Sequence, residues 1–164
     1  MSSAQSILIG DELRAFLEGP VSVLVGTRDS RLIPEITRAW GPRVSQDRHR
    51  VSLCVPLGTS RKTLDNIESN GTVAIAFSLP TNYRTFQLKG RSAMAADPEV
   101  ADLAAVDRHR EAFAVVNDQM GLPRHVVEAF WRAEVETSAA LVKISFVPDQ
   151  IFDQTPGPGA GKRL

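Results

Sequence analysis

The 164-residue chain has one cysteine, Cys54, and no excess of charge of either sign. A single cysteine excludes an intrachain disulfide and any metal site that needs two thiolates, and its apolar surroundings predict a buried, inert thiol. Its 19 Lys and Arg residues equal its 19 Asp and Glu residues, so it lacks the basic surplus of nucleic-acid-binding proteins. We expect no nucleic-acid partner, and any anion site must be local.

Long apolar runs are also missing. No window approaches the roughly 18 apolar residues of a membrane span, and the first residues lack the pattern of a signal peptide. We therefore expect a cytoplasmic protein with no membrane partner. With 43% hydrophobic and 23% charged residues the composition is that of an ordinary globular protein. The length predicts a single domain over residues 1–154, followed by a Pro/Gly-rich tail over residues 155–164.

Signatures of metal and hydrolytic sites are absent. His49, His109 and His125 are scattered, and no pair has metal-ligand spacing on one helix, so no metal site is predicted. No Gly-x-Ser-x-Gly elbow marks a nucleophile. Residues 157–162 superficially match a phosphate-binding loop, but Arg163 stands where that motif needs Ser or Thr. Neither a hydrolase nor a nucleotide-binding loop is favoured.

Alternating and short apolar segments predict mostly strands. The expected strands are residues 21–27, 32–40, 51–55, 72–78, 84–95 and 140–147, with a break at Gly41-Pro42. Helical spacing predicts a short helix capped by Asp11, one capped by Ser60 and stopped by Asn70-Gly71, one capped by Asp97 that reaches about Val116, and one around residues 126–131. Because the strands do not alternate regularly with crossover helices, the order favours a closed antiparallel barrel with α additions.

The strongest site signal is the segment Leu-Gly-Thr-Ser-Arg-Lys at residues 57–62, between a strand and a helix. Two hydroxyls, two adjacent cations and the free N–H groups of a helix N-terminus suit a phosphate group. The alternative is a capped helix whose first turn is basic. Cations there would face the positive end of the helix dipole unless an anion is bound, and from composition alone the two interpretations are equally favoured.

This segment, continued to residue 70 and followed by the apolar run 72–77, resembles the pyridoxamine 5′-phosphate oxidase superfamily. The similarity extends through residues 82–92, where the family has an Arg, a β pattern and a Gly followed by a basic residue. The resemblance implies an FMN-binding split β-barrel of six or so antiparallel strands of Greek-key type. It also implies a short N-terminal helix, a mid-chain helix, a helical pair before the last strand, and a homodimer that binds FMN between its subunits.

Carried over by position, the resemblance implies that Arg61 and Lys62 bind the FMN phosphate, assisted by Ser60 or Thr59. The strand around Val55 and Pro56 would pass along the flavin through its backbone. Thr85 stands where the oxidase has a flavin-contacting Gln, and Gln87, on the same strand face, could take over that contact. Trp40 could approach the flavin ring, although a core or interface position is an equal alternative.

The segment that binds pyridoxamine phosphate in the true oxidase is not recognisable near the end of this chain. Vitamin B6 oxidation is therefore not expected. The first hypothesis is an FMN-dependent oxidoreductase that acts on an unidentified small-molecule substrate, with no protein residue assigned as acid or base. The alternatives are a non-catalytic flavin carrier or sensor, and a split barrel that binds deazaflavin or heme.

Overall fold

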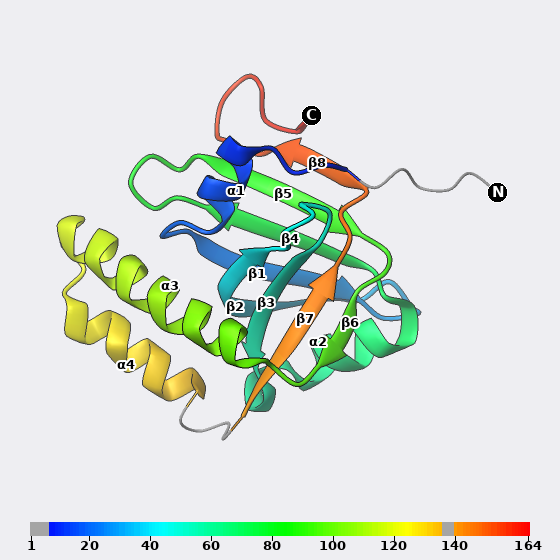
Figure 1. Cartoon of the computed structure of the whole chain (residues 1–164), viewed down its shortest axis with the longest axis horizontal. Helices are drawn as coiled ribbons and strands as arrows, with labels where there is room; N and C mark the ends of the chain where they lie inside the picture. Colours follow the sequence, from blue (N-terminus) through cyan, green and yellow to red (C-terminus); the bar gives the residue numbers. More distant parts are fainter. Residues whose placement is uncertain (1–6, 136–139) are drawn as a thin grey trace.

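The computed structural model describes residues 7–135 and 140–164 (Figure 1). These residues form one antiparallel sheet of nine strands in the order β6-β7-β3-β2-β1-β4-β5-β8-β9. The strands are β1 (Ser22–Arg28), β2 (Pro34–Val44), β3 (Val51–Pro56), β4 (Val73–Ser78), β5 (Thr85–Gly90), β6 (Met94–Ala96), β7 (Leu141–Phe146), β8 (Gln150–Asp153) and β9 (Lys162–Arg163). The helices are α1 (Asp11–Leu17), α2 (Leu57–Asn70), α3 (Val100–Gln119) and α4 (Arg124–Val135).

The sheet is split rather than closed, because β6 and β9 end the order and do not pair with each other. The predicted antiparallel barrel with helical additions is thus confirmed in its split form. Burial alternates along β1, β4 and β5, so one face of the sheet is buried and the other is half-exposed. The buried face forms the main core, which includes Phe77, Phe146, Ile75 and Leu88.

Strand β2 does not end at Gly41-Pro42 as predicted, but continues to Val44. The pairing of β2 with β3 shifts register between Trp40 and Arg43, which makes this point a β-bulge. Gly41 takes a φ of +61° there, a left-handed conformation that suits glycine. The bulge accommodates Gly41 and Pro42, the two residues that were expected to end the strand, and β2 continues beyond them.

The expected strand over residues 84–95 is two strands with different partners. β5 ends at Gly90 and pairs with β4 and β8, whereas β6 pairs with β7. A Cβ atom on Gly90 would lie 2.7 Å from the Phe146 ring, so a larger residue would not fit where the chain leaves β5. Two short strands, β8 and β9, follow the strand that was expected to be the last.

Two helix starts also differ from prediction. Asp11 is the first residue of α1 rather than its cap, which is Gly10. Helix α3 begins after Glu99 rather than at Asp97, because Glu99 and Asp102 form a reciprocal capping box. Asp102 also pairs with Arg43 at 2.5 Å and Lys143 at 3.0 Å. Burial alone would raise the pKa of Asp102, but hydrogen bonds from the Glu99 N–H, Lys143 and Arg43 lower it below its ordinary value.

Helices α3 and α4 lie side by side as a hairpin at one end of the sheet, while α2 lies at the other end of the view (Figure 1). Trp40 is 2% exposed and anchors the hairpin. Its ring meets those of Trp131 at 5.0 Å and Phe113 at 6.0 Å, both edge to face. Buried His109 of α3 accepts the Gly41 N–H at Nδ1 and contacts the Val21 carbonyl oxygen through Nε2 at 2.8 Å.

Candidate functional site

Helix α2 starts at Leu57, three residues before the predicted cap. Pro56 stands at the N-cap position and has no N–H, and the Leu57 N–H donates to the Ala140 carbonyl at 2.9 Å. The first turn has neither a side-chain cap nor an acidic residue, and Gly58 and Thr59 are exposed. These two residues are therefore exposed at the positive end of a 14-residue helix, where an anion would be stabilised.

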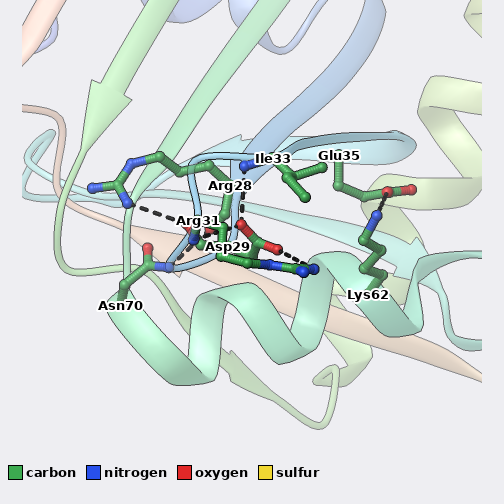
Figure 2. Close-up of polar contacts among 7 residues, drawn as sticks. All are labelled: Arg28, Asp29, Arg31, Ile33, Glu35, Lys62 and Asn70. Atoms are coloured by element: carbon green, nitrogen blue, oxygen red, sulfur yellow. Dashed lines mark hydrogen bonds and ion pairs between the residues drawn. The ribbon is translucent and has the colours of Figure 1, made fainter.

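Arg61 and Lys62 are the fifth and sixth residues of α2, so they do not lie in its first turn as predicted. The dipole therefore disfavours them less than the sequence argument assumed, since that effect fades beyond the first turn. Both are exposed. The Lys62 ammonium pairs with the Glu35 carboxylate at 3.0 Å (Figure 2). Within the described residues the Arg61 side chain has no hydrogen bond or ion pair.

Ser60, the predicted cap, is instead 1% exposed and faces the sheet. Its hydroxyl lies 2.8 Å from that of Thr37, and on the same helix the Asn66 amide donates to the Thr27 hydroxyl at 3.0 Å. Between them, the buried Thr63 hydroxyl has no partner in the described part of the chain. We call these five residues the polar seam of α2. Ser60 already has a partner, so Thr59 is the hydroxyl of this segment that faces outward.

The turn between β1 and β2 lies beside the end of α2 (Figure 2). The Asp29 carboxylate accepts the N–H groups of Arg31 and Ile33 at 2.8 and 2.9 Å, and the bond from Ile33 is the main reason that the pKa of Asp29 is lowered. The Asn70 amide donates to the Arg28 carbonyl at 2.9 Å. These bonds fix the start of β2, and with it Glu35, relative to α2.

The outward face of the sheet has a hollow where small residues meet. Gly26 pairs with Ala74, and the row is bounded by Ile36 on one side and Lys89 on the other. A pocket of about 460 Å³ forms there, and Glu35, the partner of Lys62, lines it. The first pocket is therefore linked to α2 through the ion pair of Glu35 with Lys62, although no residue of α2 lines it.

A second pocket, of about 500 Å³, lies four residues along the same strands. Its floor is another small pair, Ser22 opposite Ser78. Leu24, which is 39% exposed, stands between the two hollows on β1. The remaining lining comes from β2, the β4–β5 loop and the helical hairpin: Arg38, Trp40, Pro80, Tyr83, Phe113, Asn117, Leu122, Val127 and Phe130.

The other predicted site residues fall into two groups. Val55 and Pro56 are buried at the end of β3, directly before α2. Thr85 and Gln87 lie on the outward face of β5, where the Thr85 hydroxyl is 2.7 Å from that of Ser78 in the floor of the second pocket. Trp40 is a core residue, in agreement with one of its two sequence interpretations, and it also lines that pocket. A contact of Trp40 with the flavin ring stays a prediction.

Sequence reasoning missed Glu35, the polar seam and the helical wall of the second pocket. The contacts of these residues join segments that are far apart in the chain, so no local sequence pattern could predict them. It correctly predicted a buried Cys54, whose thiol pKa is raised to about 12 by burial, so it is not a ready nucleophile. In residues 7–135 and 140–164 no group of three or more potential His, Cys, Asp or Glu ligands gathers as a metal site.

The helices in the described ranges are all too short or too polar to cross a membrane. The fold is a split β-barrel with an exposed, uncapped start of α2 that is followed by two cations, and with two pockets on its outward face. No protein-family model matches the chain, and no curated protein matches it in sequence. Solved structures do match it, over most of their length and at low sequence identity.

A HupZ structure from Group A Streptococcus is 20% identical, with a TM-score of 0.55, and the match covers 93% of this chain and 99% of that one. A Lactobacillus delbrueckii protein provisionally named a pyridoxamine 5′-phosphate oxidase is 12% identical, with a TM-score of 0.52 and coverages of 93% and 97%. A protein named F420 reductase is 18% identical, with a TM-score of 0.50 and coverages of 84% and 94%. The resemblance inferred from sequence is therefore confirmed at the level of the fold.

Proposed function

We propose that this protein binds FMN, with the phosphate at the start of α2, and that it is an oxidoreductase acting on a small molecule. The observation that carries the proposal is the uncapped first turn of α2, whose exposed Gly58 and Thr59 are followed by Arg61 and Lys62. Backbone N–H groups, a hydroxyl and two cations together suit a phosphate monoester. When bound, FMN would supply the hydride chemistry, and the chain would supply binding and orientation.

The flavin ring requires more surface than one chain offers near α2. Gln87 and Thr85 lie on the outward sheet face, whereas neither pocket on that face is lined by Arg61 or Lys62. In this proposal a second copy of the chain covers the outward face and completes the flavin site. Apolar side chains on that face support this view, since Leu24 is 39% and Ile36 66% exposed beside two hollows.

Replacement of both cations, Arg61→Ala with Lys62→Ala, is expected to weaken FMN binding at least about a hundredfold, because two charge-assisted contacts to the phosphate are lost. The measurement is titration of flavin-free protein with FMN, followed by the quenching of flavin fluorescence. Riboflavin, which lacks the phosphate, should bind the wild type and the double variant equally.

The matched control is Lys162→Ala with Arg163→Ala, another adjacent and exposed pair of cations, on β9. This control should bind FMN like the wild type. If the Arg61/Lys62 variant purifies yellow with an unchanged FMN affinity, the phosphate assignment is wrong.

Leu24→Arg is expected to convert a dimer into a monomer, since it places a charge in the centre of the proposed interface. Light scattering at micromolar concentration is the measurement. Val100→Arg, at an apolar position that is 85% exposed on α3, is the control and should leave the dimer intact. A wild-type protein that is monomeric under these conditions would rule out the shared site.

Anaerobic reduction separates the enzyme from a flavin carrier or sensor. The flavin-loaded protein is mixed with NADH or NADPH, and the flavin absorbance is followed. Rapid bleaching, reversed by an electron acceptor, is expected for the oxidoreductase. A flavin that stays oxidised with every donor would identify a carrier.

A further inference from the structure

We infer that the second pocket is a binding site for an aromatic molecule of one or two rings that carries a hydroxyl or ring N–H group. Its volume of about 500 Å³ falls within the range of small-molecule sites, roughly 300–1,000 Å³. The site does not include the cations of α2, so its test is separate from the phosphate assignment. It lies on the sheet face that the proposed second copy would cover, and Trp40, which the sequence resemblance places near the flavin ring, is one of its walls. Its walls come from three separate parts of the fold, which hold them in fixed relative positions.

Several walls of the pocket are aromatic, and next to them the core rings around Trp40 already pack edge to face. Trp40 meets Phe113 at an interplanar angle of 87° and Trp131 at 88°. Phe130, 59% exposed, and Tyr83, 63% exposed, stand at the mouth. An added ring between these side chains would gain edge-to-face or offset contacts and remove exposed apolar surface from water. An aliphatic ligand of equal size would also remove apolar surface from water, but it would not gain the ring contacts.

Besides Arg38, whose guanidinium donates to the Ser22 hydroxyl at 3.4 Å, the polar groups of the pocket are few and placed on different sides. Ser22 and Ser78 place hydroxyls on the floor, where the Ser78 hydroxyl also lies 2.7 Å from that of Thr85. The Asn117 amide nitrogen donates to the Phe113 carbonyl oxygen at 2.7 Å, which fixes the orientation of the side chain. The Asn117 Oδ1 accepts no hydrogen bond from the described part of the chain, so it is available to a donor on the ligand. This arrangement favours a hydroxyl or N–H on the ring over an ether or a bare hydrocarbon.

Tyr83, at the mouth of the pocket, has an unusual backbone conformation. Tyr83 has a φ of +59°, an uncommon conformation for a bulky residue, and its N–H donates to the Leu79 carbonyl at 2.9 Å. The loop is thereby closed tightly, and Tyr83 lines the pocket. Leu32 and Arg48 take a similar positive φ in other turns, so this conformation of Tyr83 sets the shape of the pocket mouth and does not by itself indicate a ligand.

The test is isothermal titration of the protein with 2-naphthol, compared with 2-methoxynaphthalene and cyclohexanol. We expect 2-naphthol to bind with a dissociation constant of roughly 100 µM or below. The methoxy analogue, which lacks the donor, should bind at least about tenfold more weakly, and cyclohexanol more weakly still. Absence of saturable 2-naphthol binding up to about 1 mM would overturn the inference.

Three variants locate the binding. Ser78→Phe, which fills the floor, and Phe130→Ala, which removes an exposed wall without disturbing the core, should each weaken 2-naphthol binding at least about tenfold. Asn117→Leu should bring the affinity for 2-naphthol down to that for the methoxy analogue. Arg61→Ala with Lys62→Ala should bind 2-naphthol like the wild type, whether or not flavin binding is lost. Unchanged binding by folded Ser78→Phe and Phe130→Ala proteins would place the probe elsewhere and refute the site.

Discussion

Gly41→Ala is expected to destabilise the protein by about 3–5 kcal/mol. Two costs add. Gly41 has a φ of +61°, which an alanine adopts only with strain. Its new Cβ would also lie 2.5 Å from the Val106 backbone nitrogen and 2.7 Å from the Val106 Cα, and backbone atoms of a packed helix cannot yield easily.

Urea or thermal unfolding measures this loss, and a decrease in the melting temperature of about 10 °C is expected for a chain of this size. Gly121→Ala separates the two costs, because Gly121 has a φ of +88° but no atom within 4 Å of the position that a Cβ would take. It should lose only the strain term, about 1–2 kcal/mol. Equal losses in the two variants would show that α3 does not press on the bulge as described.

Acid should destabilise the protein through His109 before the carboxylates take part. Burial lowers the pKa of His109 from 6.5 to about 4. The unfolded chain therefore binds a proton below pH 6.5 that the folded chain does not take up until about pH 4. The stability due to the neutral ring is complete above pH 6.5 and is lost as the pH falls towards 4, by about 3 kcal/mol in all.

The measurement is the free energy of unfolding in urea at several pH values from 7 to 4. His109→Gln should be less stable than the wild type at pH 7, because the bonds to Gly41 and Val21 are perturbed, but its stability should fall less steeply with acid. His125→Gln, at an exposed position of α4, is the matched control and should keep the wild-type profile. Equal slopes for the wild type and His109→Gln would contradict a buried neutral His109.

Local patterns predicted those elements whose cause is local. Alternation placed β1 and β4 within a residue or two of their observed bounds, and Asn70-Gly71 marked the end of α2, where Gly71 takes the left-handed conformation. The failures come from contacts distant in sequence. Strand β2 survives Gly41-Pro42 because the bulge is packed against α3, and no pattern around residue 41 contains that information.

The candidate site shows the same division. The types of residue at 57–62 indicated phosphate chemistry, and the structure leaves Thr59, Arg61 and Lys62 exposed. Which hydroxyl faces outward could not be predicted, because Ser60 is turned inward by Thr37, twenty-three residues earlier. The second pocket could not be predicted from the sequence for a similar reason. Its floor is formed by Ser22 and Ser78, which become neighbours only through strand pairing.

The polar seam of α2 has a consequence for how the anion site is prepared. Apolar side chains between a helix and a sheet tolerate sliding, but a shift of α2 by one turn would separate Ser60 from Thr37 and Asn66 from Thr27, and leave buried polar groups without partners. The hydrogen bonds of the polar seam therefore fix the position of α2 along the sheet. In the proposed phosphate site the backbone of Arg61 and Lys62 would therefore be positioned before binding, and binding would not carry the cost of ordering the helix.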